Sequence, residues 1–270
     1  MVVQHNLSAI NTNRQMGVVT NALQKSTEKL SSGYKINRAA DDAAGLSISE
    51  KMRSQIRGLN KASDNAQDGI SLIQVAEGAL NETHSILQRM NELATQAAND
   101  TNTSVDRQSI KDEIKQLNEE LDRISSTTQF NKQDLLTGGF SGKLQVGALE
   151  GQTMDVKISL AVSAKGLNVS AVEVSTNAKA GAAMQSIQDA IESVSKQRSK
   201  LGAIQNRLEH TINNLDTNAE NTQAAESRIR DTDMADEMVQ YSKNNILSQA
   251  GQSMLTQASQ QTQGVLSLLQ

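Results

Sequence analysis

The residues of this sequence whose spacing could support chemistry are its clustered aspartates. Asp41 and Asp42 are adjacent and could form an acid/base pair, whereas Asp231, Asp233 and Asp236 are spaced faintly like a calcium loop. A calcium loop also needs a central glycine and a terminal glutamate, which this stretch lacks. A catalytic pair needs convergent polar partners, and only alanine and glycine directly flank the first pair. Neither cluster therefore predicts a reactive site.

Both clusters are better explained as helix starts. A carboxylate can accept hydrogen bonds from the free N–H groups of a first helical turn, and its charge suits the positive helix end. Gly33 follows Leu30-Ser-Ser, where a glycine in the left-handed conformation can close a preceding helix. We therefore expect residues 33–45 to join two helices, and Asp231, Asp233 and Asp236 to open the last one.

Other chemistry-bearing residues are sparse. His5, His84 and His210 are far apart, no HExxH, Walker, Rossmann or GxSxG pattern occurs, and the chain has no cysteine. The sequence therefore predicts no enzyme activity, no catalytic residue, no metal ligand set and no cofactor.

Composition points to helices that meet along narrow seams. The 270 residues include 2 Tyr, 2 Phe, no Trp and no Pro, so long helices are permitted but a thick core is not. The net charge of −4 argues against nucleic acid, and no apolar run is long enough for a membrane span. The start also lacks the pattern of a signal peptide.

The two ends differ in charge. Residues 1–40 carry five basic side chains and one acidic, residues 231–270 four acidic and one basic, and none is charged after Lys243. Opposite signs suit segments that pair. An uncharged, Gln- and Ser-rich tail is unusual for an exposed surface, and we expect it to be buried in an assembly.

Apolar residues repeat every seven positions in two long stretches, which indicates coiled-coil seams. The first repeat is Met52, Leu59, Ala66, Ile73, Leu80, Leu87, Ala94, and the second is Ile187, Val194, Leu201, Leu208, Leu215, Thr222, Ile229. A 4-3-4-3 pattern joins Ile110, Ile114, Leu117, Leu121 and Ile124. Between these runs, residues 155–160 and 167–174 alternate as half-buried strands do, so we expect a small β element over about residues 142–175.

The predicted fold is mainly α: an elongated antiparallel coiled-coil rod with a small β-rich tip mid-chain and both termini at the same end. We expect an N-terminal arm (1–41), the first half of the rod (42–139), the tip (140–178), a returning helix (179–230) and a C-terminal arm (231–270).

The chain resembles bacterial flagellins over many separate motifs. They are LSSGYKINRAADDAAGLSISEKMRSQIRGL (30–59), QDGISLIQVAEGALNETHSILQRMNELATQAAN (67–99), QFNKQDLL (129–136), LGAIQNRLEHTINNL (201–215), AESRIRDTDMADEM (225–238) and NNILSQAGQSMLTQASQQTQGVLSLLQ (244–270). The resemblance implies a subunit that is exported unfolded and polymerises into the hollow helical filament outside the cell, with terminal arms that fold on assembly.

The resemblance also implies partners: further copies of the chain, the flagellar export apparatus and its chaperone, and hook-associated and cap proteins. The apolar residues of the arms are then the expected self-assembly residues. They are Leu7, Ile10, Leu23, Leu30, Leu247, Ala250, Met254, Val265 and Leu268.

Flagellins are also ligands of a host Toll-like receptor, through an arginine and a leucine on the long helix and a glutamate on the next. The matching residues are Arg89, Leu93 and Glu113, and Asn91 stands where an arginine is common in the family. Arg89 and Leu93 are four residues apart, so one helix face carries both.

Other readings stay open on the sequence alone. A hook–filament junction protein shares the helical ends. An enzyme on this scaffold would need an inserted catalytic domain, and a chemoreceptor-like signalling coiled coil would need a membrane anchor.

Overall fold

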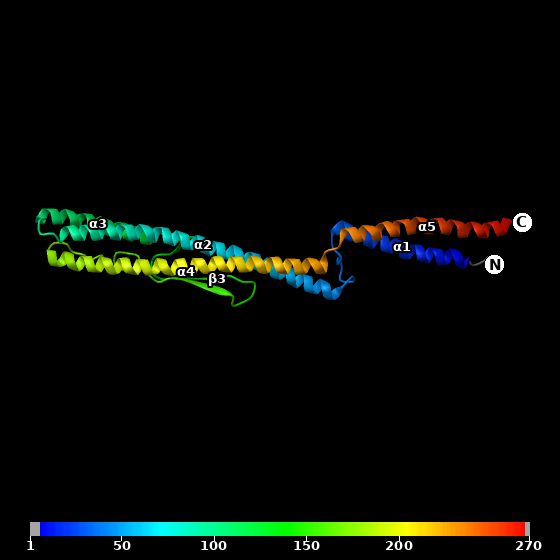
Figure 1. Ribbon diagram of the computed structural model, residues 1–270, viewed down its shortest axis with the longest axis horizontal. Coiled ribbons are helices and arrows are strands. Elements are labelled where there is room, and N and C mark those ends of the chain that lie inside the picture. The colour runs from blue at the N-terminus through cyan, green and yellow to red at the C-terminus, as the bar shows by residue number, and fades with distance from the viewer. Residues whose placement is uncertain (1–5, 268–270) are drawn as a thin grey trace. The chain divides into compact units, whose positions relative to one another are not determined.

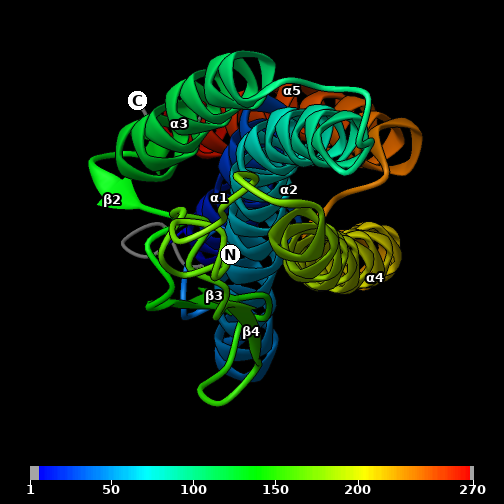
Figure 2. The same cartoon turned by 90° about the vertical axis from the view of Figure 1, so that its left-hand side faces the viewer.

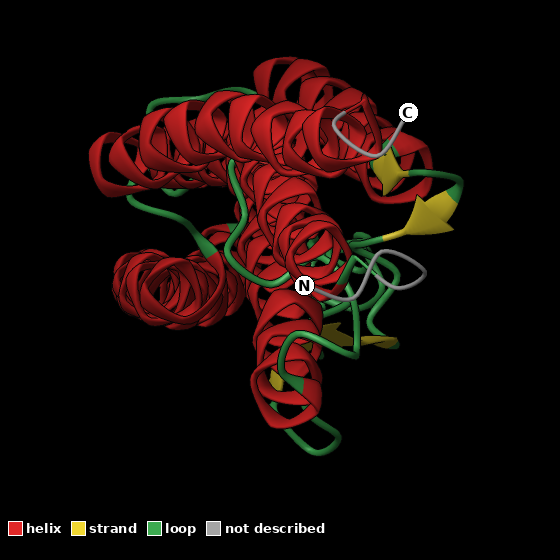
Figure 3. Cartoon of the chain, turned by 90° about the vertical axis from the view of Figure 1, so that its right-hand side faces the viewer, coloured by secondary structure: helices red, strands yellow, loops and turns green. Residues whose placement is uncertain are grey.

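A computed structural model describes residues 6–267, with side chains to residue 261. The chain forms two compact units: unit 1 comprises residues 1–54 and 221–270, and unit 2 comprises residues 55–220. Helices dominate the described residues, with two small antiparallel sheets (Figure 3). This confirms the predicted mainly α class with a small β element.

The core of unit 2 forms where α2 (Ala43–Ala97) and α4 (Asn177–Arg230) run antiparallel (Figure 1). Ser63 donates to Asp216 over 3.0 Å, and Arg198 lies 3.8 Å from Glu77, so the two sequences advance in opposite directions. Eleven members of the predicted seven-residue repeats are confirmed as its buried line, each below 9% exposed: Leu59, Ala66, Ile73, Leu80, Leu87, Ala94, Ile187, Val194, Leu201, Leu208 and Leu215. The remaining members, Met52, Thr222 and Ile229, belong to unit 1 and are only half-buried.

Helix α3 (Ser104–Thr127) packs on this pair. It begins with a capping box in which Thr103 and Asp106 each accept from the other's backbone N–H, satisfying two free donors of the first turn. Ile110, Ile114 and Leu121 are buried, as their 4-3 spacing predicts. The Arg107 side chain bonds to the Ala97 carbonyl at 3.1 Å and so anchors the start of α3 to the end of α2.

The β strands follow α3. Strands β1 (Gln129–Phe130) and β2 (Gln133–Asp134) form a hairpin around Asn131 and Lys132, both at positive φ, which matches the turn favoured between antiparallel strands. Strands β3 (Phe140–Gln145) and β4 (Thr153–Ile158) pair in register from Phe140–Ile158 to Gln145–Thr153.

The second hairpin lies to the side of the helices (Figure 2), and its strands run alongside α4 (Figure 1). Asn65 of α2 donates to the Gln145 carbonyl, and Gln197 of α4 to the Lys157 carbonyl. A Cβ at Gly58 would lie 2.8 Å from Ala148, so the hairpin turn approaches α2 where the helix carries no side chain. Contact with two helices holds this short sheet on the flank of unit 2.

The strand expected at 167–174 is absent from the described structure. Leu167, Val169 and Val174 are buried, which explains the alternation, but the backbone turns instead of pairing. Asn168 has a φ of 57°, and the amides of Val169 and Ser170 both bond to the Ala164 carbonyl. Local turns thus satisfy the backbone while the apolar side chains reach the core.

Unit 1 contains α1 (Leu7–Ser32) and α5 (Met234–Ser267), which lie side by side and antiparallel (Figure 1). Asn6 donates to the Ala258 carbonyl at 2.9 Å, and Lys29 lies 3.5 Å from Glu237. The latter pair matches the opposite charges of the two ends. Asn6 caps α1 by accepting from the Ala9 amide, and Gly33 closes it at φ 75°, as predicted.

The stability of unit 2 should depend on its seam. We expect Leu80→Ala to reduce the free energy of unfolding by ~2–5 kcal/mol, because the residue is fully buried and its loss leaves a cavity. Urea denaturation measures this. Leu149→Ala removes a leucine that is 68% exposed and should cost ~0.5 kcal/mol or less; equal losses at the two positions would contradict this assignment of the core.

Candidate self-assembly surface

Two of the clustered aspartates, Asp42 and Asp233, cap helices. Asp42 Oδ1 accepts from the Gly45 amide at 2.9 Å and so opens α2, while Asp41 Oδ2 accepts from the amides of Asn37 and Arg38 and closes the linker. Asp233 Oδ1 accepts from Ala235 and Asp236 in the same way. The prediction that these aspartates open helices is confirmed for Asp42 and Asp233. Asp236 lies in the first turn of α5, and Asp231 instead pairs with Tyr34 through a β-bridge. Among the described residues, no group of three or more His, Asp or Glu is placed to hold a metal ion.

The linker between α1 and α2 pairs with the linker between α4 and α5. The Lys35 amide donates to the Arg230 carbonyl at 2.6 Å, and the Thr232 amide donates to the Gly33 carbonyl at 3.0 Å. The Arg230 guanidinium lies 4.8 Å from the centre of the Tyr34 ring. This pairing was not predicted, because a contact between distant loops leaves no periodic signal in a single sequence.

Arg230 also reaches the start of α2. Its Nη1 donates to Glu50 Oε1 at 2.7 Å, and only 12% of the Arg230 side chain is exposed. This hydrogen bond lowers the pKa of Glu50, and backbone hydrogen bonds, chiefly from Arg38, lower that of Asp41. Ionised Glu50 and Asp41 therefore stabilise the folded state at any pH above their ordinary pKa range. This stabilisation is lost as the pH falls through their lowered pKa values in the folded protein.

Helix α1 presents two apolar faces. One faces α5: Leu23 and Leu30 are half-buried there, and Met16 lies over Gly251, with its Cγ 3.9 Å from where a Cβ would stand. At helical spacing, Leu7, Ile10 and Val18 fall on the opposite face, where they are 71%, 60% and 61% exposed.

Helix α5 shows the same division. Glu237, Gly251 and Ala258 fall on the line that meets α1, and Ala258 is buried. Other apolar residues of the helix lie outside this line and are exposed. We call five of them, together with the three of α1, the outer face: Leu7, Ile10, Val18, Val239, Ile246, Leu247, Ala250 and Met254. Met234 and Met238, in the first turns of α5, are also exposed but are not counted in this face.

The expected self-assembly residues therefore separate into three groups. Leu7, Ile10, Leu247, Ala250 and Met254 are exposed on the outer face, whereas Leu23 and Leu30 lie between the two helices. The side chain of Val265, and Leu268 altogether, lie outside the described residues. Sequence reasoning missed Val18, Val239 and Ile246, although the seven-residue step from Val239 to Ile246 could have revealed them.

The three residues matched to a receptor site are divided by burial. Arg89 Nε donates to Glu113 Oε1 at 3.0 Å and Nη1 to Glu92 at 3.2 Å, on the surface of α2 and α3. These bonds, led by the one to Glu113, raise the pKa of Arg89. Leu93 is only 2% exposed and belongs to the core of unit 2. The structure thus brings Arg89 and Glu113 together at the surface and places Leu93 beneath it.

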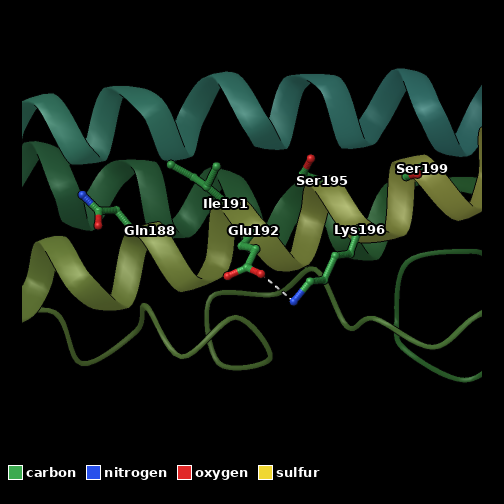
Figure 4. A pocket seen from close by; sticks show the side chains of 6 residues that line it. All are labelled: Gln188, Ile191, Glu192, Ser195, Lys196 and Ser199. Carbon is green, nitrogen blue, oxygen red and sulfur yellow. Dashed lines mark ion pairs between the residues drawn. The ribbon is translucent and has the colours of Figure 1, made fainter.

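A shallow groove of about 550 Å³ runs along α4 (Figure 4). It is lined by Gln188, Ile191, Glu192, Ser195, Lys196 and Ser199. Its two charged side chains, Glu192 and Lys196, pair with each other at 2.6 Å. Within this lining, no unpaired charge or nucleophile–base pair is present to bind or attack a ligand.

The geometry describes a helical structural subunit with a closed core in unit 2 and uncovered apolar faces on unit 1. Family models for the bacterial flagellin N-terminal helical region and C-terminal helical region match residues 3–141 and 184–269. The chain belongs to the bacterial flagellin family, whose members are structural proteins, and it is a subunit of the flagellar filament.

Individual relatives agree. The chain is 55% identical to a flagellin of Halalkalibacterium halodurans, over 100% of both chains, and 50% identical to a flagellin of Bacillus subtilis, again over 100% of both. It is similar to the crystal structure of Bacillus cereus flagellin, with 34% identity and a TM-score of 0.51 over 60% of this chain and 94% of that one. These likenesses imply an extracellular location in the filament, and the junction-protein alternative has no better support. No described helix has the length and apolarity needed to cross a membrane.

The linker pairing generates a prediction. Arg230→Ala removes the bond to Glu50 and the contact with Tyr34, so we expect the amides of Lys35 and Thr232 to exchange with solvent about tenfold or more faster, because a charge-assisted bond is lost. Hydrogen exchange measured by NMR checks this. Arg228→Ala, at an exposed position two residues earlier, is the matched control; equal acceleration in both variants would show that the Arg230 side chain does not hold the linkers.

Proposed function

We propose that the outer face of α1 and α5 is the surface through which copies of this chain assemble, and that the two helices gain lasting order only when neighbours cover it. The observation that supports this proposal is that α1 and α5 bury few side chains, whereas unit 2 has a closed core. Among their described side chains, Ser26 of α1 and Ala258 of α5 are the only buried ones. Because the two helices bury so little apolar surface, the free energy of burial compensates poorly for the conformational entropy that they lose on ordering.

The character of the outer face supports a packed partner. Exposed Leu, Ile, Val and Met side chains on adjacent helices are typical of a protein–protein contact. No charged side chain follows Lys243, so a neighbour packing on the second half of α5 meets no charge that must be desolvated. The same proposal includes export before assembly, with help from an export apparatus and chaperone. It also includes contact with hook-associated and cap proteins.

A charge placed on the outer face tests this assignment. We expect the double variant Val239→Asp, Ile246→Asp to stay monomeric where the unchanged protein forms long filaments, since each burial of an unpaired carboxylate is strongly unfavourable. Electron microscopy and sedimentation measure assembly. Circular dichroism should show helix content rising on polymerisation of the unchanged protein and not for the variant.

Ser242→Asp is the matched control, because it adds a charge at an exposed polar position of the same helix. It should assemble with at most a small delay. Filaments formed by the double variant would refute the outer face as the contact. Dilute subunits with fully helical ends, in turn, would refute folding coupled to assembly.

The surface pair of Arg89 and Glu113 favours a second role, recognition by the flagellin-sensing Toll-like receptor. We propose that Arg89, with Glu113 held against it, is the exposed contact, and that Leu93 supports this surface from the core beneath. The observation in favour is that two helices present the pair together, with Arg89 bonded to Glu113 and Glu92.

Reversing one charge of this pair tests the second role. We expect Arg89→Asp to reduce receptor activation by about tenfold or more, because it removes the cation and leaves three carboxylates adjacent. A reporter cell assay with subunits at graded concentrations measures this. Arg123→Asp, at an exposed arginine of α3 that pairs with Glu120, is the control, and a response unchanged by Arg89→Asp removes the proposal.

A further inference from the structure

The methionines of the chain are unequally exposed. Among the described residues, those in the exposed class are Met234, Met238 and Met254, at 48%, 49% and 57%, and all three are on α5. In unit 2, by contrast, Met90 is 0% and Met154 is 8% exposed. The most exposed methionines are therefore concentrated on one of the two helices that carry the outer face.

An exposed methionine thioether is a site of reversible two-electron oxidation. With hydrogen peroxide, a sulfur lone pair attacks one peroxide oxygen, the O–O bond breaks, and the sulfur keeps that oxygen as a sulfoxide. The other oxygen leaves as water after taking up a proton. The sulfur is oxidised, the peroxide is reduced, and a flexible apolar side chain becomes a polar one.

The place of Met254 gives this change a consequence. It lies four residues after Ala250 and seven after Leu247, so the three share one side of α5 within the outer face. A sulfoxide there adds a strong acceptor to a surface that offers apolar groups. Met234 and Met238 are one turn apart at the start of α5, beside Glu237, which pairs with Lys29 of α1.

We propose that Met234, Met238 and Met254 are peroxide-sensitive modification sites that control assembly, with Met254 the one on the outer face. Oxidation of the free subunit converts them to sulfoxides and prevents its addition to a polymer, whereas packing of neighbours shields Met254. Methionine sulfoxide reduction restores the subunit. This inference rests on the proposed assembly through the outer face.

The experiment treats the full-length subunit with dilute hydrogen peroxide, removes the peroxide with catalase and starts polymerisation with filament seeds. Mass spectrometry locates the sulfoxides, and sedimentation gives the critical concentration. We expect Met254 to oxidise at least tenfold faster than Met90 in free subunits, and at least tenfold more slowly once assembled. The critical concentration should rise about tenfold or more, as expected for an unpaired polar group buried at each contact.

Substitutions locate the effect. The triple variant Met234→Leu, Met238→Leu, Met254→Leu should have the same critical concentration before and after peroxide, whatever its value before treatment, since leucine keeps the apolar volume and cannot be oxidised. Met184→Leu, a half-buried position in unit 2, is the matched control and should leave the sensitivity unchanged. Treatment of oxidised subunits with the two methionine sulfoxide reductases should restore the original critical concentration.

Any of three results overturns the inference: an unchanged critical concentration for subunits carrying the three sulfoxides, an equal rise on peroxide treatment of the triple variant, or rapid oxidation of Met254 inside filaments. The proposed assembly surface is tested separately, by the assembly of the Val239→Asp, Ile246→Asp variant without peroxide. If that variant assembles, the premise falls and this inference falls with it.

Discussion

Burial of apolar side chains that recur every seven residues is the interaction on which the structure depends, and the two units share it unequally. In unit 2 the repeat of α2 meets that of α4, α3 and β4 close the sides, and residues such as Leu80, Leu201 and Ile158 become inaccessible. In unit 1 two helices meet with no third layer, so apolar residues remain on the surface. A chain with few aromatic residues completes one core in unit 2 and leaves apolar residues exposed in unit 1.

The helical repeats could be read from sequence because each depends on local spacing. The seams of α2, α3 and α4, the left-handed Gly33 and the capping roles of Asp42 and Asp233 were all predictable in this way. The strand at 153–158 was also visible as alternation. Each of these features is decided within a few residues of chain.

What the sequence did not indicate depends on distant partners. Residues 167–174 alternate like a strand, yet they turn: the amides of Val169 and Ser170 bond to the Ala164 carbonyl, while Leu167 and Val169 join the core of unit 2. The Asn131-Lys132 turn was missed because it lacks glycine. Leu93 and Arg89 share a helix face by spacing, but the position of α3 decides that one is buried and the other exposed. The outer face could be predicted only in part, because spacing does not say which of two apolar faces finds a partner within the chain.

The antiparallel pairing of residues 33–35 with residues 230–232 has a mechanical consequence. A tensile load on one linker is shared by the other, because the amides of Lys35 and Thr232 bond across in opposite directions. Neither linker can straighten alone without breaking these bonds and withdrawing Arg230 from Tyr34 and Glu50. Torque that reaches α1 is therefore carried into the first turn of α5, and the two terminal helices bear it jointly.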